Sequence, residues 1–235
     1  MRRIAVLILA AGDSSRLGEP KQLLRFRGRS LIRTAARAAL ESDCRPVVAV
    51  LGSRAERVQV ELNDLPVTTA VNRYWQAGMN SSILAGLQVL AGDVCGAIIM
   101  LCDQPFVSAQ LLNQLASIHL TTGSGIVASE FGGTLGVPAF FSREHFLELA
   151  ALSQSEGARS VILKHRGRAR RVLFPEGAFD IDTYEDYLAA LKFESAQPPP
   201  RAFTSCTLAT IRRPSNSAAP REVRSRVRSE STTSR

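Results

Sequence analysis

The feature that most constrains the fold of this chain is an apolar segment, residues 4–9, that runs directly into a small-residue loop with two basic side chains. Six consecutive apolar residues are typical of a parallel strand that is covered on both faces. The loop, residues 10–21, begins with small residues, carries Arg16 and ends at Lys21. Small residues let backbone N–H groups approach an anion, and a guanidinium and an ammonium suit a polyphosphate. The segment therefore predicts a nucleotide-binding loop at the end of a first strand.

The loop matches neither of the two commonest phosphate-binding patterns. The Walker pattern requires Lys-Ser/Thr directly after its last glycine, whereas Gly18 is followed by Glu19-Pro20-Lys21. The dinucleotide pattern Gly-x-Gly-x-x-Gly is also absent. A secretory signal is the alternative interpretation, because two arginines precede the apolar run. That run has only the minimum length for a signal, and no processing boundary follows it, so we favour the nucleotide loop.

Length and composition indicate one α/β domain with some excess of chain. The 235 residues are 45% hydrophobic, which is sufficient for a packed core, and no apolar run is long enough to span a membrane. The four cysteines show no CxxC spacing and no histidine partners at metal-ligand spacing, so we expect free thiols in a reducing cytoplasm. These cysteines are Cys44, Cys95, Cys102 and Cys206.

The positive charge of the chain is concentrated in its C-terminal segment. From Glu194 onward there are eight arginines and three glutamates, so this segment holds +5 of the net +8 and leaves +3 for residues 1–193. The segment is rich in proline, serine and arginine and lacks an apolar period, which predicts a disordered tail over 194–235 after a folded domain over 1–193. Its arginines can attract anionic surfaces, but the chain shows no element that reads nucleic acid, so we expect neither specific nucleic acid nor a membrane as partner.

Strand and helix patterns alternate along residues 1–193, which predicts a three-layer α/β/α fold with a mostly parallel central sheet. Strands are expected at residues 4–9, 46–51, 67–71, 97–101, 125–129, 134–141 and 171–174. Helices are expected from Ser30 to 40, from about 54, from 81 or 82, after 108, and at 143–152, 158–164 and 185–192. The turn Gly132-Gly133 joins two strands directly, so the late part of the sheet should be mixed.

Two acidic positions follow predicted strands, where ligands bind in open α/β sheets. Asp103 ends a buried strand, and Asp180 and Asp182 precede the last helix, which Thr183 is placed to cap. Paired carboxylates from separate strand ends suit a Mg²⁺ ion that also binds phosphate oxygens. For Asp103, the alternative is a structural role as a cap of the turn at Pro105. For Asp180 and Asp182, the alternative is a loop that caps the last helix, and one of the two can have that role alone.

Several segments, in order, resemble the nucleotidyltransferases that act on the molybdenum cofactor. Residues 9–21 are similar to their signature Leu-Ala-Ala-Gly-x-Ser-x-Arg-Met-Gly-x-x-Lys, with Leu17 replacing Met. The other matching segments are Trp75-Gln76-Ala77-Gly78-Met79 with Ser82 and Gly86, Asp103-Gln104-Pro105, Gly136-Val137-Pro138, Glu156-Gly157-Ala158-Arg159, and Asp180-Ile181-Asp182-Thr183 with Asp186. Together they extend from residue 4 to about 191, which makes the resemblance specific although each motif alone is weak.

The resemblance implies a Rossmann-like nucleotidyltransferase that transfers CMP from CTP to the phosphate of the molybdenum cofactor, molybdopterin, and releases pyrophosphate. Within the family that the chain resembles, alanine at the position of Ala11 favours CTP over GTP. Mg²⁺ would be held by Asp103 and Asp182, while Arg16 and Lys21 would neutralise charge on the phosphates. Such a reaction depends on positioning and electrostatics and needs no protein nucleophile, in agreement with a sequence that shows no Ser-His-Asp or Cys-His pattern.

The resemblance also implies which residues bind the two substrates. The catalytic residues are Arg16, Lys21, Asp103 and Asp182. The nucleotide is expected to contact Leu9, Ala10, Ala11, Gly12, Ser14, Ser15, Arg16, Lys21, Gly78, Ser82 and Asp103. The acceptor is expected near Trp75, Gly136 and Pro138. A molybdoenzyme or its maturation chaperone is implied as a protein partner.

Two other functions stay open on the sequence. The same fold activates sugar phosphates and other small phosphorylated alcohols, and acceptor pockets vary more than nucleotide loops. The second alternative is a noncatalytic carrier that binds the nucleotide or the cofactor. Such a carrier would be expected to lack an acidic metal ligand, whereas Asp103 and Asp182 are both present.

Overall fold

The structure of the chain is a computed structural model in which residues 3–15, 17–90 and 92–196 are described. Arg16, Cys206 and the predicted tail from residue 197 onward lie outside the described residues. The last helix, α7 (Tyr184–Ala196), continues past Phe193, the residue at which we placed the end of the folded domain. The boundary itself stays a prediction.

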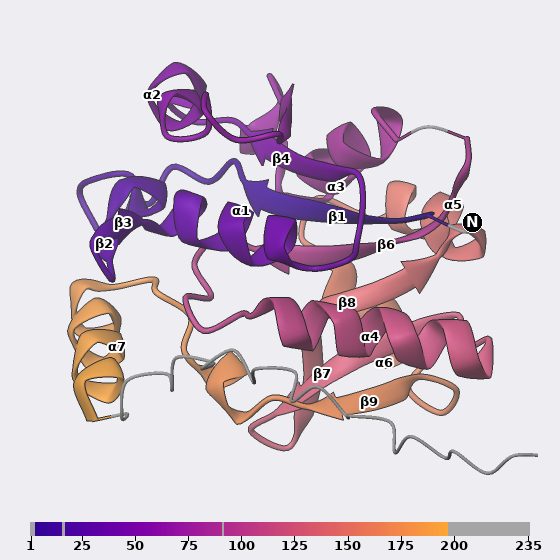
Figure 1. Cartoon of the computed structure of the whole chain (residues 1–235). Coiled ribbons are helices and arrows are strands. Elements are labelled where there is room, and N and C mark those ends of the chain that lie inside the picture. Colours follow the sequence, from indigo (N-terminus) through magenta and orange to yellow (C-terminus); the bar gives the residue numbers. More distant parts are fainter. Residues whose placement is uncertain (1–2, 16, 91, 197–235) are drawn as a thin grey trace, which may run out of the picture. The chain divides into compact units, whose positions relative to one another are not determined.

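Seven strands form one central sheet in the order β5-β4-β1-β6-β8-β7-β9 (Figure 1). Their bounds are β1 Arg3–Ala10, β4 Val47–Leu51, β5 Thr68–Val71, β6 Val94–Leu101, β7 Ile126–Phe131, β8 Thr134–Ser142 and β9 Arg170–Leu173. β1 pairs in parallel with β4 and with β6, whereas β8 is antiparallel to both β6 and β7. The predicted α/β class, with a mostly parallel sheet and a mixed late portion, is confirmed.

Helices cover both faces of this sheet (Figure 1). One face carries α1 (Leu31–Glu41), α2 (Ala55–Val60) and α4 (Ala109–Thr122), and the other carries α3 (Met79–Gln88), α5 (Phe146–Ala150) and α6 (Ala158–Lys164). The central strand β1 shows how one apolar run builds both layers. Val6 and Ile8 pack with the first group of helices, while Leu7 and Leu9 pack with the second, because side chains alternate across a strand.

A small hairpin that the sequence patterns did not predict precedes α1. Its strands are β2 (Arg25–Phe26) and β3 (Arg29–Ser30), joined by Arg27 and Gly28, both of which have positive φ. Phe26 packs in a third apolar cluster with Ile181 and with Ala190 of α7. The hairpin therefore holds α7 and the acidic loop that leads into it.

The ends of several elements differ from the expected ones for local reasons. The helix expected from 81 or 82 begins at Met79, because Gly78 at φ +106° takes a conformation that suits glycine and lets the helix start earlier. β6 begins at Val94 rather than 97, because Arg3 extends β1 and pairs with Val94. The helix expected at 143–152 is a 3₁₀ turn, η3 (Arg143–His145), followed by the short α5.

Two predicted helix caps are present. The Ser30 hydroxyl accepts the N–H of Arg33 at 3.4 Å at the start of α1. The Thr183 hydroxyl accepts the N–H of Asp186 at 3.2 Å, and the Asp186 carboxylate accepts the N–H of Thr183 at 2.9 Å in return. Among the described residues, no helix has the length and apolar character that crossing a membrane requires.

Candidate active site

The loop after β1 is held in place by a buried amide, Gln22. Its Nε2 donates to the carbonyl of Ala10 at 3.0 Å and to the carbonyl of Gly12 at 2.7 Å. Gln22 is only 1% exposed, so these bonds replace contacts with water and fix the turn over the sheet edge. The sequence analysis missed Gln22. The sequence contained an indication of its role, because this amide stands next to Lys21 at the start of an otherwise apolar segment, where a side chain is expected to be buried.

Ser14 positions Lys21. The Ser14 hydroxyl accepts the backbone N–H of Lys21 at 2.9 Å, and its carbonyl accepts the N–H of Leu17 at 2.9 Å. Ser14 itself has a φ of 57°, a left-handed conformation that reverses the chain. The neighbouring Ser15 is exposed, and its backbone N–H donates to the Asp13 carboxylate at 3.3 Å. Neither serine lines the cavity described below.

Lys21 joins the two carboxylates that were predicted to hold a metal ion. Its Nζ forms an ion pair with Oδ2 of Asp103 and a second one with Oδ1 of Asp182 at 2.7 Å. The backbone N–H of Ile181 donates to the Asp103 carbonyl at 3.1 Å and thereby fixes the loop of Asp182 beside the end of β6. The structure thus brings together three of the four predicted catalytic residues, and the fourth, Arg16, lies outside the described residues.

This cluster carries more negative than positive charge. Asp180 keeps contact with solvent, but desolvation by the surrounding protein raises the pKa of Asp180 to about 6, and the charges of Asp103 and Asp182 contribute in the same direction. Desolvation by burial tends to lower the pKa of Lys21, but the charge of Asp103 and the hydrogen bonds to Asp103 and Asp182 outweigh it and raise that pKa. Lys21 is therefore charged and contacts two carboxylates, with Asp180 as a third acidic group nearby.

The cluster fits a divalent cation. Oδ1 of Asp103 is buried and has no hydrogen-bond partner among the described residues, while Oδ2 pairs with Lys21. A buried carboxylate oxygen without a partner is costly unless a cation or donor satisfies it. The Asp182 side chain is 53% exposed, so a hydrated ion can reach it. Hard carboxylate oxygens of this kind are the ligands that Mg²⁺ prefers.

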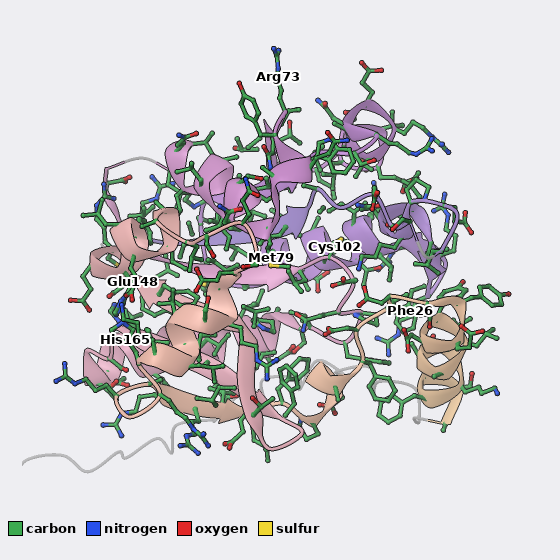
Figure 2. The ribbon with its side chains drawn as sticks, turned by 180° about the vertical axis from the view of Figure 1, so that it is seen from behind. Phe26, Arg73, Met79, Cys102, Glu148 and His165 are labelled. Atoms are coloured by element: carbon green, nitrogen blue, oxygen red, sulfur yellow. The ribbon has the colours of Figure 1, made fainter. Side chains whose placement is uncertain are left out.

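A cavity of about 480 Å³ opens between the loop after β1, the first turn of α3 and the end of β6. This volume is in the range of small-molecule sites. Its lining includes most residues predicted to contact the nucleotide, namely Leu9, Ala10, Ala11, Gly12, Lys21, Gly78, Ser82 and Asp103. Trp75, which was expected near the acceptor, also lines this larger cavity. Met79 and Cys102, also in the lining, are labelled in the middle of Figure 2.

Two further residues shape this cavity without having been singled out in the sequence. Asn72 is buried, and its Nδ2 donates to the hydroxyl oxygens of Ser82 at 3.0 Å and Ser81 at 2.8 Å. Gly52 allows two walls to approach closely, since a Cβ there would lie 2.6 Å from the Ala11 carbonyl oxygen and 2.7 Å from Cβ of Trp75.

A second cavity of about 210 Å³ adjoins the first, because both are lined by Leu9, Met79 and Leu101. Its other residues include Gly136, Val137, Phe131, Gln104, Arg159 and Asp180. Of the three residues expected at the acceptor, only Gly136 is in this lining. Pro138 is buried instead, and its carbonyl accepts the Ser129 hydroxyl at 2.7 Å within the sheet.

No thiol chemistry is favoured in the larger cavity. Cys102 lines it, but burial raises the pKa of the Cys102 thiol strongly, and the adjacent Asp103 carboxylate adds to this effect. The thiol is therefore protonated at neutral pH and is a poor nucleophile.

The role of Gln22 gives a first testable prediction. We expect Gln22→Leu to lower the free energy of unfolding by about 1–3 kcal/mol, because the buried carbonyl of Ala10 and the carbonyl of Gly12 lose their donor, and to weaken nucleotide binding through the loosened loop. Thermal denaturation and nucleotide titration measure the two effects. Gln88→Leu, an exposed glutamine at the end of α3, is the matched control. If the two variants behave alike, Gln22 does not hold the loop.

Comparison with known proteins now places the chain in a family. Its residues 6–169 match the family described as the MobA-like NTP transferase domain. The chain belongs to this family. Because the match covers both the loop after β1 and Asp103, it includes the residues that line the larger cavity.

Relatives of this MobA-like chain carry different names. Nicotine blue oxidoreductase from Paenarthrobacter nicotinovorans is 37% identical over 140 residues, which cover 59% of this chain and 67% of that protein. The bifunctional protein GlmU from Streptomyces coelicolor is 34% identical over 131 residues, 54% of this chain but only 27% of GlmU. The chain therefore spans about a quarter of the GlmU sequence.

Solved structures agree with the family. Rv0371c from Mycobacterium tuberculosis H37Rv superposes with a TM-score of 0.70 at 28% identity, covering 81% of this chain and 98% of that one. A second structure of Rv0371c is a complex with manganese, with a TM-score of 0.69 and 25% identity over 81% of this chain and 98% of that one. The MobA-like chain is accordingly a nucleotidyltransferase with a Rossmann-like fold, of a family that uses nucleoside triphosphates.

Proposed function

We propose that this protein transfers CMP from CTP to the phosphate of the molybdenum cofactor and releases pyrophosphate. The observation that carries the proposal is the cluster of Lys21, Asp103 and Asp182, of which Lys21 and Asp103 line the larger of two adjoining cavities. One cavity has the size of a nucleotide site, and the other provides a separate place for an acceptor. A transferase needs this division, because both substrates must be bound when the phosphate is transferred.

A divalent cation, Mg²⁺ in our proposal, would be held by Asp103 and Asp182. The buried oxygen of Asp103, which lacks a partner in the described part of the chain, supports this assignment, and so does the manganese complex of the related Rv0371c. When bound, the ion supplies positive charge to the phosphates of the nucleotide.

The side chains of the chain itself provide the rest of the electrostatic environment. Lys21 carries a positive charge at the cavity wall, where it can neutralise the charge that develops on the α-phosphate and on the departing pyrophosphate. Arg16 of the same loop is assigned the same role from its motif. The acceptor phosphate forms the new bond to the α-phosphorus as the bond to pyrophosphate breaks, so no residue has to act as a nucleophile.

In this proposal, the part of the cavity lined by Ala11, Gly78 and Ser82 selects cytosine over the other bases. Because Asn72 donates to the Ser82 oxygen, the hydroxyl proton of Ser82 is left free to donate to another acceptor. Ser82 lines the cavity, so the carbonyl oxygen of a pyrimidine is a suitable partner. The backbone beside Ala11 also lines this cavity.

The second cavity suits a flat acceptor with an anionic group. Gly136 lets the wall approach Phe131, since a Cβ there would lie 2.8 Å from the Phe131 ring. Arg159, which donates to the Thr134 hydroxyl at 2.9 Å, supplies a cation in the lining. These features support molybdopterin as the acceptor. A molybdoenzyme or its maturation chaperone as the recipient, and a location in the cytoplasm, stay predictions.

The proposal is tested by incubating the purified protein with Mg²⁺, the molybdenum cofactor and CTP, GTP, ATP or UTP in separate reactions, and measuring pyrophosphate. We expect release with CTP, dependent on the cofactor. Release with another nucleotide contradicts the assignment of the base. If a sugar phosphate or another phosphorylated alcohol replaces the cofactor as acceptor, the assignment of molybdopterin is wrong.

A truncation tests the proposed domain boundary. Removing residues 197–235 is expected to leave the rate of pyrophosphate release within about twofold of the full chain, because all of the described residues that line the two cavities precede that segment. The comparison is made by steady-state kinetics of the two proteins at equal concentrations of folded protein. Loss of activity in a truncated protein that remains folded would show that the tail takes part in the reaction.

A further inference from the structure

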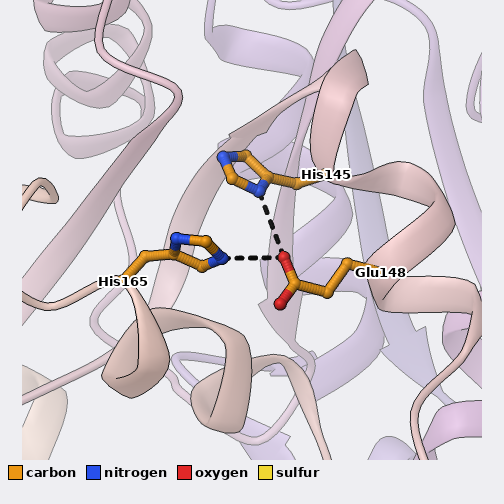
Figure 3. A group of neighbouring side chains, drawn as sticks. All are labelled: His145, Glu148 and His165. Atoms are coloured by element: carbon orange, nitrogen blue, oxygen red, sulfur yellow. Dashed lines mark hydrogen bonds and ion pairs between the residues drawn. The ribbon is translucent and has the colours of Figure 1, made fainter.

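A second cluster of metal-ligating side chains lies apart from the nucleotide cavity. It consists of His145 at the end of η3, Glu148 on α5 and His165 directly after α6. In Figure 2, Glu148 and His165 lie together and well away from Met79 and Cys102. Figure 3 shows that both imidazole rings point at one oxygen of the Glu148 carboxylate. The cluster exists only because α5 and α6 pack together.

The distances within this cluster are close to those of a metal site. Nδ1 of His145 is 3.4 Å from Oε2 of Glu148, and Nε2 of His165 is 2.8 Å from the same oxygen. The three ligand atoms all lie within 4.8 Å of one another. Around a tetrahedral Zn²⁺ with bonds of about 2.0–2.2 Å, ligand atoms are about 3.3–3.6 Å apart, so small side-chain rotations suffice to enclose an ion.

We propose that His145, Glu148 and His165 bind Zn²⁺ or a similar divalent transition-metal ion. Two imidazoles and one carboxylate are a donor set that suits Zn²⁺. His145 and Glu148 are separated by three residues along one helical turn, which places both side chains on one face. His165, directly after α6, provides the third ligand.

The two oxygens of Glu148 have separate partners, which favours this arrangement. Oε1 pairs with Nζ of Lys164 at 2.6 Å, and Oε2 faces the two histidines. One carboxylate oxygen therefore faces the two histidines, while the other is paired with Lys164.

A second carboxylate lies next to the far nitrogen of His145. Oε1 of Glu144 is 3.7 Å from Nε2 of His145 and accepts the Ser142 hydroxyl at 2.7 Å. With an ion bound, a carboxylate in this position would favour a proton on Nε2 and so leave the Nδ1 lone pair for the ion. This is how outer carboxylates orient histidines that bind metals.

An ion can reach the cluster from solvent. The side chains of His145, Glu148 and His165 are 15%, 24% and 29% exposed. A hollow of about 230 Å³ reaches Glu148 and Lys164, although neither histidine is in its lining. The first turn of α6 lines the second cavity, so the ion would fasten to α5 a helix that contributes to the acceptor side.

The test is a titration of the full chain, stripped of metal, with Zn²⁺ in competition with a chromophoric chelator. We expect one Zn²⁺ to bind tightly, and we expect His165→Gln and Glu148→Gln each to weaken this binding by about 100-fold or more. His145→Gln should do the same. Zn²⁺ should raise the melting temperature of the parent but not of these variants. With Co²⁺ in place of Zn²⁺, the absorption spectrum should show nitrogen and oxygen coordination without a thiolate band.

Two controls separate this site from other places where the ion can bind. Asp182→Asn removes a carboxylate of the active-site cluster and is expected to retain the tight Zn²⁺. Lys164 lies beside His165 and pairs with Glu148 but is not a ligand. The variant Lys164→Gln should therefore also retain the ion. Equal Zn²⁺ affinity of the parent and His165→Gln, or a thiolate band in the Co²⁺ spectrum, would overturn the proposal. So would loss of the ion in Asp182→Asn alone. Each result can be obtained whether or not the protein transfers CMP.

Discussion

Replacing Asp103 by asparagine is expected to reduce the rate of nucleotidyl transfer by at least about 10³-fold, which corresponds to about 4 kcal/mol of transition-state stabilisation. The amide has the same shape as the carboxylate but no charge. Oδ1 of Asp103 is the buried oxygen that has no partner among the described residues, and Oδ2 pairs with Lys21. The substitution therefore removes the ligand for the divalent ion and one counter-charge of Lys21 together.

The measurement is kcat and KM for CTP as a function of Mg²⁺ concentration, with thermal denaturation to show that the variant is folded. Asp64→Asn is the matched control, because Asp64 also forms an ion pair, with Arg33 at 2.5 Å, but lies outside both cavities. We expect Asp64→Asn to retain parent activity. Near-normal turnover in folded Asp103→Asn would rule out the role assigned to this carboxylate.

Lys21→Ala is expected to lower kcat by about 10²–10³-fold with a much smaller effect on KM for CTP. The reason is that the ammonium is assigned to the charge that develops on the phosphates during transfer, not to the ground state alone. The Lys21 side chain is only 16% exposed, so water replaces it poorly at the cavity wall.

Steady-state kinetics of Lys21→Ala and of Lys192→Ala, an exposed lysine on α7, provide the comparison. The Lys192 variant should behave as the parent protein does. A change confined to KM in Lys21→Ala would mean that the lysine binds the nucleotide without stabilising the transition state. A melting temperature close to that of the parent shows that loss of the two ion pairs has not unfolded the protein.

Much of this architecture was predictable because local patterns and tertiary packing agree. The apolar run of β1 alternates between the two cores, and Ser30 and Thr183 cap the helices they were expected to cap. The loop ending at Lys21 and the acid after β6 meet because parallel strands place their carboxyl ends at one edge of the sheet. The larger cavity follows from that topology.

Other parts of the site could not be predicted, because they depend on burial and on which wall a motif faces. A buried amide such as Gln22 or Asn72 has the same letter as an exposed one, and only the fold shows its partners. The motif containing Trp75 was visible, but its position in the nucleotide wall depends on the close approach of Gly52 to Ala11. The hairpin before α1 has strands of two residues, too short for any periodic signal.

The metal cluster illustrates the same limit. His145 and Glu148 have helical spacing in the sequence, but His165 joins them only when α6 packs on α5. The spacing of cysteines and histidines along the chain gave no indication of the third ligand.

The central claim is that the CMP moiety of CTP moves to the acceptor phosphate within one active site. In the most direct measurement, excess enzyme reacts for a single turnover with CTP labelled at the α-phosphate, in the presence of Mg²⁺ and the molybdenum cofactor. The product that carries the label is then identified. The account predicts that the label moves into a cofactor–CMP dinucleotide, that one unlabelled pyrophosphate is released for each molecule formed, and that both fail in Asp103→Asn. Label that stays in CTP, or that is released as free CMP, would contradict the account.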